Sequence, residues 1–183
     1  MQSILEEFLN FSRPLVPLNL GDEDLGALAA EVCTMHEAMA ELQHAELALV
    51  AEASVPLRCD QRKVKQILIN LLQNALDASP VGGRVTLEVR SVDGVAELQI
   101  RDEGPGLEPA VAERVFEAGV TTKASGSGLG LNVARGLARQ HGGEVTLQSH
   151  GEGGALCTLR LPQRFTLAEA AAPRSPSVAQ EVS

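Results

Sequence analysis

The feature that most limits the possible folds is a pair of alternating segments joined by Asp93-Gly94. The segments RVTLEVRS (84–91) and VAELQIRD (95–102) carry apolar residues at about every second position, as half-buried strands do. An Asp-Gly dipeptide between two such segments favours a tight β-hairpin. EVTLQS (144–149) and ALCTLRLP (155–162) form a second predicted hairpin across HGEGG. The sequence therefore predicts a sheet built largely from antiparallel pairs.

Segments with apolar residues at helical spacing lie between these strands in the sequence. Asp22 and Asp24 form an N-cap signal before one apolar-periodic run, and Asp60 precedes another that ends before Pro80. The predicted helices are 25–43, 61–79, 108–116 and 129–140, and the further predicted strands are 46–53 and 57–59. Strands in hairpins with helices between them predict an α+β fold: a two-layer α/β sandwich with a mixed, mostly antiparallel sheet and one helical layer. A doubly wound sheet is not expected.

The two ends of the chain differ from the middle. Residues 3–12 place apolar side chains on one helical face before Pro14, and we expect them to end a longer helical element. Residues 166–183 mix Ala, Ser and Pro without periodicity, which predicts a disordered tail. The expected folded domain is 15–165.

Composition excludes several classes of function. A net charge of −9 and an aromatic content of 2% argue against a nucleic-acid partner. No apolar run approaches the roughly 20 residues of a membrane span, so we expect no direct membrane insertion. Cys33, Cys59 and Cys157 are scattered without CxxC spacing, which favours buried, reduced thiols and a cytoplasmic protein.

The stretch KASGSGLGLNVARGLARQHGG (123–143) is rich in glycine and leads directly into a helix. Such stretches often hold phosphate. A dinucleotide fingerprint requires a strand immediately before its glycines, and here the polar VTTKAS precedes them. The P-loop string GxxxxGK[ST] does not occur in the sequence. Both familiar phosphate motifs therefore fail.

Paired amides lie on the predicted helix 61–79. Asn70 and Asn74 are four residues apart and share a face, and Asp77 lies one turn beyond. Amide oxygens suit Mg²⁺, which takes few protein ligands together with phosphates and water. Capped or solvated asparagines are the simpler explanation of the pair taken alone.

A third candidate site follows the predicted strand 95–102. Asp102, Gly104 and Gly106 stand in RDEGPGLEP, where glycines would let the backbone approach a flat ligand. The carboxylate can accept a hydrogen bond from an exocyclic amine. Taken alone, DxGxG is equally consistent with a tight turn.

Taken together, Asn70-x₃-Asn74, Asp102-x-Gly104-x-Gly106, Phe116 and the glycines 126, 128 and 130 resemble the N, G1, F and G2 boxes of bacterial histidine kinases. GEGGALCTLRLP (151–162) resembles the last glycine-rich turn and final strand of that family. The resemblance covers roughly 20–164 and implies a Bergerat-type ATP-binding fold, shared with gyrase, the chaperone Hsp90 and the mismatch-repair protein MutL. QILINLLQNALDAS and VTTKASGSGLGLNVARGL look most like nitrogen-regulatory-type sensor kinases.

The resemblance also implies residue roles. Asp102 would accept from the adenine amino group, with Thr158 in support. Asn74 would coordinate Mg²⁺, and Asn70 would take the catalytic position at which ATPase relatives carry a water-activating Glu. Lys123 would be both catalytic and phosphate-binding. The full implied nucleotide-binding set is Asn74, Asp77, Asp102, Gly104, Gly106, Thr122, Lys123, Gly126, Ser127, Gly128, Leu129, Gly130 and Thr158.

Three departures from the family pattern stand out. Asp77 replaces a common Lys or Arg, which places more phosphate charge on Lys123, and FEAGVTTK lacks the usual aromatic pair of the lid. No acceptor histidine is evident, because His36 lacks the expected following motif. LNFSRP resembles the end of the second helix of a dimerisation hairpin, so 1–14 would be that truncated element and the acceptor would precede Met1.

The implied function is a sensor histidine kinase catalytic domain. It would bind Mg·ATP and transfer the γ-phosphate to a histidine on the dimerisation hairpin of the full-length homodimer, with relay to a response regulator. One alternative is a non-catalytic nucleotide-sensing or docking module. Another is an ATPase or serine kinase of the same superfamily. Asn70 disfavours the ATPase because an amide cannot act as a general base, and the LNFSRP segment disfavours a free-standing serine kinase.

Overall fold

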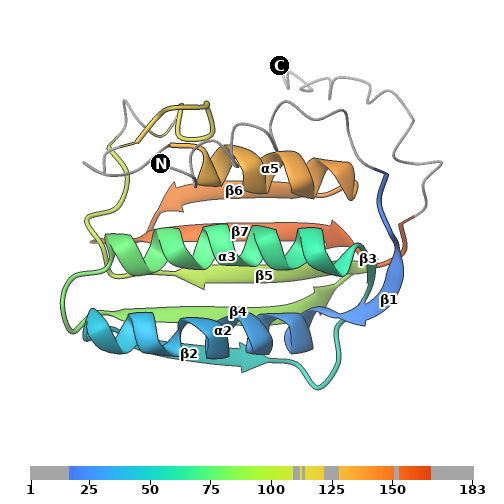
Figure 1. Cartoon of the computed structure of the whole chain (residues 1–183), viewed down its shortest axis with the longest axis horizontal. Coiled ribbons are helices and arrows are strands. Elements are labelled where there is room, and N and C mark those ends of the chain that lie inside the picture. The colour runs from blue at the N-terminus through green and yellow to red at the C-terminus, as the bar shows by residue number, and fades with distance from the viewer. Residues whose placement is uncertain (1–16, 109–111, 113, 122–127, 151–152, 166–183) are drawn as a thin grey trace, which may run out of the picture.

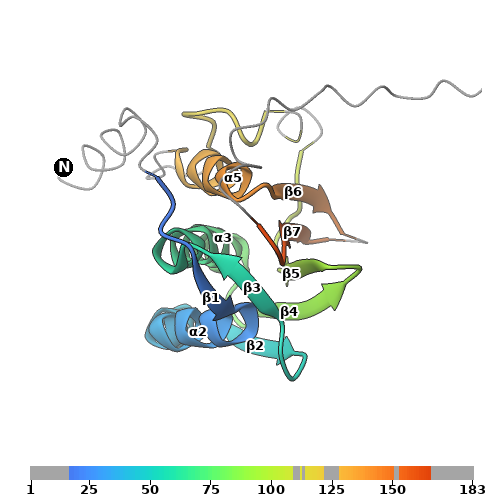
Figure 2. The same cartoon turned by 90° about the vertical axis from the view of Figure 1, so that its right-hand side faces the viewer.

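The computed structural model describes residues 17–108, 112, 114–121, 128–150 and 153–165. These residues form two layers, with the helices on one face of a sheet (Figures 1 and 2). The helix expected at 3–12, the hairpin segment 1–14 and the tail 166–183 lie outside the described residues.

The main sheet has five strands in the order β2-β4-β5-β7-β6 (Figure 1). Its strands are β2 (Glu46–Ala51), β4 (Arg84–Val92), β5 (Val95–Arg101), β6 (Glu144–Ser149) and β7 (Ala155–Pro162). The β2–β4 pair is parallel and the other three pairs are antiparallel. The predicted mixed, mostly antiparallel sheet is confirmed.

The β4–β5 hairpin follows the sequence prediction closely. Val92 pairs with Val95 across the turn. Asp93 has φ 50° and Gly94 has φ 79°, and positive φ at both central residues is what a type I′ hairpin turn requires. The Asp-Gly dipeptide therefore fixes this register.

The helical layer consists of α2 (Leu25–Leu42), α3 (Gln61–Ala78) and α5 (Gly130–Gln140), with α3 between the other two (Figure 1). Asp24 caps α2 by accepting from the Ala27 N–H at 2.9 Å. Asp60 caps α3 by accepting from the Lys63 N–H at 3.2 Å. Both predicted helices thus begin where the aspartates placed them.

One part of the first cap prediction is wrong. Residues 21–24 form a strand, β1 (Gly21–Asp24), which pairs antiparallel with β3 (Pro56–Cys59) in a separate small sheet. Asp22 pairs there with Arg58, 3.1 Å away, and does not cap α2. The four residues GDED carry no strand-like pattern, and their partner strand lies far along the chain.

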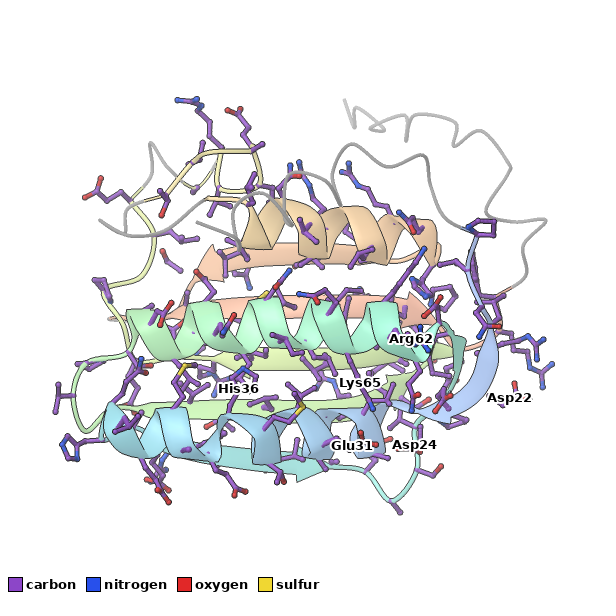
Figure 3. The ribbon with its side chains drawn as sticks, viewed as in Figure 1. Asp22, Asp24, Glu31, His36, Arg62 and Lys65 are labelled. Carbon is purple, nitrogen blue, oxygen red and sulfur yellow. The ribbon has the colours of Figure 1, made fainter. Side chains whose placement is uncertain are left out.

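Aliphatic side chains fill the space between the layers. The buried face of α3 consists of Val64, Ile67, Leu68, Leu71, Leu72, Ala75 and Leu76. Leu87, Leu98 and Leu159 meet it from the sheet, each essentially fully buried. Lys65 of α3 pairs with Glu31 of α2 at 2.5 Å at the helix surface (Figure 3). The sheet and the buried faces of the helices therefore share one core.

His36 and the cysteines belong to the packed interior. His36 lies on α2 (Figure 3) with only 6% of its surface exposed, and its Nδ1 is 2.8 Å from the Val32 carbonyl oxygen. This burial agrees with excluding His36 as a phosphoacceptor. All three cysteines are free and buried, as expected.

Candidate functional site

The described parts of the predicted motifs meet at one end of the helical layer. The end of β5, the second half of α3 and the start of α5 all lie at the left of the molecule in Figure 1. A methyl group placed on Gly104 would lie 2.6 Å from the Ala78 carbonyl oxygen, so the loop after β5 is pressed against the end of α3. Residues far apart in sequence thus converge.

Asp102 is buried and its orientation is fixed by backbone donors. Its Oδ1 accepts from the N–H of Gly104 at 2.9 Å and from the N–H of Ala155 at 3.1 Å. The Asp102 N–H in turn donates to the Ala155 carbonyl at 3.1 Å. The carboxylate is therefore held between the loop after β5 and the start of β7.

Gly154 makes this arrangement possible. Its φ is +88°, and a Cβ there would lie 2.1 Å from the Asp102 carbonyl oxygen. No side chain fits at that distance. The glycine-rich turn before β7 is therefore needed to bring the Ala155 N–H to the Asp102 carboxylate.

Ser149, which sequence reasoning missed, holds the next part of the same loop. The Leu107 N–H donates to Ser149 Oγ at 3.0 Å, and this hydroxyl lies close to Gly106, whose φ is +76°. A lone serine at the end of a strand gives no sequence signal for this role. The hydrogen bond from Leu107 to Ser149 thereby fixes the segment with Asp102 and both glycines to the end of β6.

Thr158 does not support Asp102, which corrects its predicted placement. Thr158 pairs with Gln99 in the β5–β7 ladder. Ile100, two positions before Asp102 and therefore on the same face, pairs with Cys157. Side chains alternate between the faces of a sheet, and Ile100 and Cys157 face the helices. The Thr158 side chain therefore lies on the opposite face from the buried carboxylate.

Cys157 stands near Asp102 instead. Burial and, to a smaller extent, the charge of the nearby Asp102 carboxylate raise the pKa of the Cys157 thiol to about 12. The thiol is therefore neutral at physiological pH and behaves as a small apolar group.

Asn70 connects α3 to α5. Its Nδ2 donates to the carbonyl oxygen of Gly130, the first residue of α5, at 3.1 Å. Its Oδ1 accepts from Gln66 Nε2, one turn earlier on α3, at 2.9 Å. This contact satisfies an amide that would otherwise be costly near the core. Gln66 was not predicted, although its spacing of four from Asn70 is a usable signal.

Asn74 and Asp77 continue along α3. Asn74 is half-buried, one turn beyond Asn70. Asp77 is exposed and accepts a long hydrogen bond, 3.5 Å, from Gln43 at the end of α2. Gln43 follows α2, which lies on the side of α3 opposite α5 (Figure 1); the place of Asp77 in the nucleotide site stays a prediction.

The N-cap residue of α5 is Leu129, whose apolar side chain cannot cap the first N–H groups of the helix, and the first turn of α5 carries no acidic residue. Gly128 precedes it with φ +68°, and its carbonyl accepts from the Gly119 N–H at 3.2 Å. Thr122, Lys123, Gly126 and Ser127 lie outside the described residues.

The donor set limits how a metal could be held. Within the described ranges, no group of three or more histidine, cysteine or acidic side chains could hold a metal ion. The amides of Asn70 and Asn74 supply oxygen ligands of the kind Mg²⁺ accepts, but too few for a protein-only site. The residues fit a magnesium ion that arrives with phosphate ligands.

No helix in the described part of the chain has both the length and the apolar character needed to cross a bilayer.

Comparison with known proteins gives a consistent result. Residues 59–164 match the family described as Histidine kinase-, DNA gyrase B-, and HSP90-like ATPase. The histidine protein kinase DivJ of Caulobacter vibrioides is 39% identical over 122 residues, covering 64% of this chain and 20% of DivJ. The structure of full-length ShkA in complex with AMPPNP is 28% identical with a TM-score of 0.81, covering 91% of this chain and 36% of ShkA.

Histidine kinase ThkA in complex with the response regulator protein TrrA has the same fold. It is 24% identical with a TM-score of 0.78, covering 89% of this chain and 47% of that chain. The chain spans between 20% and 29% of the length of the curated relatives DivJ, AfsQ2 of Streptomyces coelicolor and sporulation kinase A of Bacillus subtilis.

Proposed function

The chain belongs to the family of histidine kinase-, DNA gyrase B-, and HSP90-like ATPases, and we propose that it is the catalytic domain of a sensor histidine kinase. It binds Mg·ATP and delivers the γ-phosphate to a histidine on a dimerisation hairpin of the full-length homodimer. The observation that carries this proposal is that one helix joins the described motifs: the Gly104 loop after the buried Asp102 packs against the end of α3, and Asn70 of α3 donates to Gly130 at the start of α5.

Asp102 recognises the base in this proposal. Two backbone N–H groups orient its carboxylate, which favours the charged form and fixes the direction in which it can accept a third hydrogen bond. The exocyclic amine of adenine is such a donor. The loop with Gly104 and Gly106 lies beside it, and the family resemblance assigns both glycines to the base and ribose.

The phosphates bind at the start of α5. The N-termini of α2 and α3 are occupied by the carboxylates of Asp24 and Asp60, whereas α5 begins after the apolar Leu129. The N–H groups of a helix N-terminus and the helix dipole favour an anion there. Lys123, Thr122, Gly126 and Ser127 are proposed to complete this site on the strength of the family resemblance.

Asn74 would hold the magnesium ion, with Asn70 beside it. When bound, Mg²⁺ neutralises phosphate charge and orients the triphosphate. Asn70 carries no titratable proton, so the chain activates no water through it. This chemistry favours transfer to a nucleophilic imidazole that another element supplies.

The proposed partners follow from this reaction. Phosphohistidine passes its phosphoryl group to the receiver domain of a response regulator, and ThkA, which shares this fold, has been solved with such a protein. Because ATP is the donor, we place this part of the protein in the cytoplasm. The resemblance to nitrogen-regulatory-type kinases concerns the sequence motifs alone.

The test uses ATP labelled at the γ-phosphate, this chain, and a separately made hairpin carrying the acceptor histidine. We expect acid-labile, base-stable label on the hairpin, and none when Asp102→Asn replaces the wild-type chain. Binding of ATP without transfer would favour a nucleotide-sensing module. Release of inorganic phosphate without labelled hairpin would favour an ATPase.

A further inference from the structure

Two side chains of α5 hold Phe116 against that helix. The Asn132 amide donates to the Phe116 carbonyl oxygen at 2.8 Å, and Arg135 Nη2 donates to the same oxygen at 3.2 Å. The Arg135 guanidinium also lies over the Phe116 ring, 4.7 Å from its centroid. Both donors lie on one face of α5, since they are three residues apart. Asn132 and Arg135 thus hold both the backbone carbonyl and the ring of Phe116.

Phe116 in turn anchors the segment that follows it. Its ring is half-buried and packs against the core. Two turns carry the chain onward, with the Glu117 N–H donating to the Arg114 carbonyl at 2.8 Å and the Val120 N–H donating to the Glu117 carbonyl at 3.3 Å. The position of Gly119 therefore depends on where Phe116 is held.

Gly119 meets Gly128 directly through the backbone. The Gly119 N–H donates to the Gly128 carbonyl at 3.2 Å, and a Cβ on Gly128 would lie 2.6 Å from the Gly119 carbonyl carbon. Gly128 stands two residues before α5 begins. The approach of these two residues at the helix N-terminus is therefore close and easily disturbed.

We infer that Asn132 and Arg135 are positioning residues of the nucleotide site: by fixing Phe116 on α5, they fix the Gly119–Gly128 contact at the helix N-terminus. This inference rests on the proposed function, in which the phosphates bind at that terminus. Neither side chain needs to touch the nucleotide. Their removal should weaken the part of the affinity that depends on phosphate and leave base recognition at Asp102 intact.

The experiment measures two dissociation constants for each variant of the 183-residue chain, one for AMPPNP with Mg²⁺ and one for adenosine. Arg135→Met and Asn132→Ala should each weaken AMPPNP binding by roughly tenfold or somewhat less, with adenosine binding changed by less than about twofold. Arg139→Met is the matched control, because Arg139 lies one turn further along α5 and is exposed. It should leave both constants unchanged.

A double-mutant cycle tests the ring contact. In a Phe116→Leu background, Arg135→Met should cost less AMPPNP affinity than in the wild type, and Arg135→Lys should be intermediate because a cation remains over the ring. Asn132→Ala retains Arg135 and so provides a milder variant if Arg135→Met does not fold.

Three results would overturn the inference. One is unchanged AMPPNP affinity in both variants, and another is an equal effect of Arg139→Met. The third is an equal loss of AMPPNP and adenosine affinity, which would assign Asn132 and Arg135 to structural stability alone. Failure of the wild-type chain to bind AMPPNP would instead contradict the proposed function, and the inference would fall with it.

Discussion

Asn70, in the middle of α3, donates its side-chain amide to the carbonyl oxygen of Gly130, the first residue of α5, across 3.1 Å. The two residues belong to different sequence motifs, 60 positions apart. Asn70 therefore links the helix that carries both amides to the start of α5.

Asn70→Ala should weaken both binding and folding. It removes the donor to Gly130, which we expect to lower the free energy of unfolding by about 1 kcal/mol and Mg·ATP affinity by roughly tenfold. Gln66→Ala is the comparison variant, since it keeps the Asn70–Gly130 bond and removes only the donor to Asn70 Oδ1. Calorimetric titration and urea unfolding measure the two effects. Equal losses in both variants would show that the link to α5 has no special role.

Asp102→Asn should abolish or sharply weaken ATP binding, although the two side chains have nearly the same volume. The N–H groups of Gly104 and Ala155 both donate to Oδ1, so an asparagine that keeps its oxygen there places an NH2 donor where aspartate has its second acceptor oxygen. Glu103→Gln makes the same chemical change one residue along, where the side chain is exposed and a glutamine oxygen can still accept from the Arg84 N–H. We expect near wild-type affinity in that control. Unchanged titrations for Asp102→Asn would contradict the role of Asp102 in base recognition.

The hairpin around Asp93-Gly94 and helix α3 were predictable because their signals are local. A turn dipeptide, an N-cap and a regular spacing of apolar residues each act within a few positions. Strand β1 was not predictable, since Gly21–Asp24 depends on pairing with Pro56–Cys59. The parallel β2–β4 pair is likewise non-local, with α3 lying between its strands in sequence.

Thr158 shows a different limit of sequence reasoning. The β7 segment was predicted correctly, yet the role of one residue in it depended on which face of the sheet it occupies. A difference of one position in a strand reverses that face. The resemblance placed Thr158 beside Asp102, and the pairing with Gln99 places it on the far side.

Gly154→Ala and Gly136→Ala should have opposite effects on stability. At Gly154 the added methyl would lie 2.1 Å from the Asp102 carbonyl oxygen at a φ of +88°, and we expect a loss of roughly 2–5 kcal/mol. At Gly136, on the exposed side of α5, a methyl meets nothing within 4 Å. There the greater helix propensity of alanine should add roughly 0.5–1 kcal/mol. Denaturant midpoints compare the two, and similar shifts would refute the close approach of Gly154 to Asp102.

His141 should make folding stability sensitive to mild acid. Its ring is 1% exposed, its Nε2 accepts from the Asp60 N–H at 3.1 Å, and its Nδ1 lies 2.8 Å from the Leu137 carbonyl oxygen. This arrangement requires the neutral ring with its proton on Nδ1, because a protonated Nε2 would face another donor. Burial lowers the pKa of His141 below its ordinary 6.5.

At mildly acidic pH a smaller fraction of His141 is therefore protonated in the folded protein than in the unfolded chain. Stability from the neutral ring is complete above about pH 6.5 and declines as the pH falls toward the lowered pKa, by at most about 1.4 kcal/mol per pH unit. Urea unfolding between about pH 5 and about pH 7.5 measures this slope, and that range limits interference from carboxylate titration. His141→Leu should flatten it while lowering stability throughout, because the Asp60 N–H then loses its acceptor. The exposed His150, changed to Gln, should leave the slope intact; an unchanged slope in His141→Leu would refute the buried neutral ring as its source.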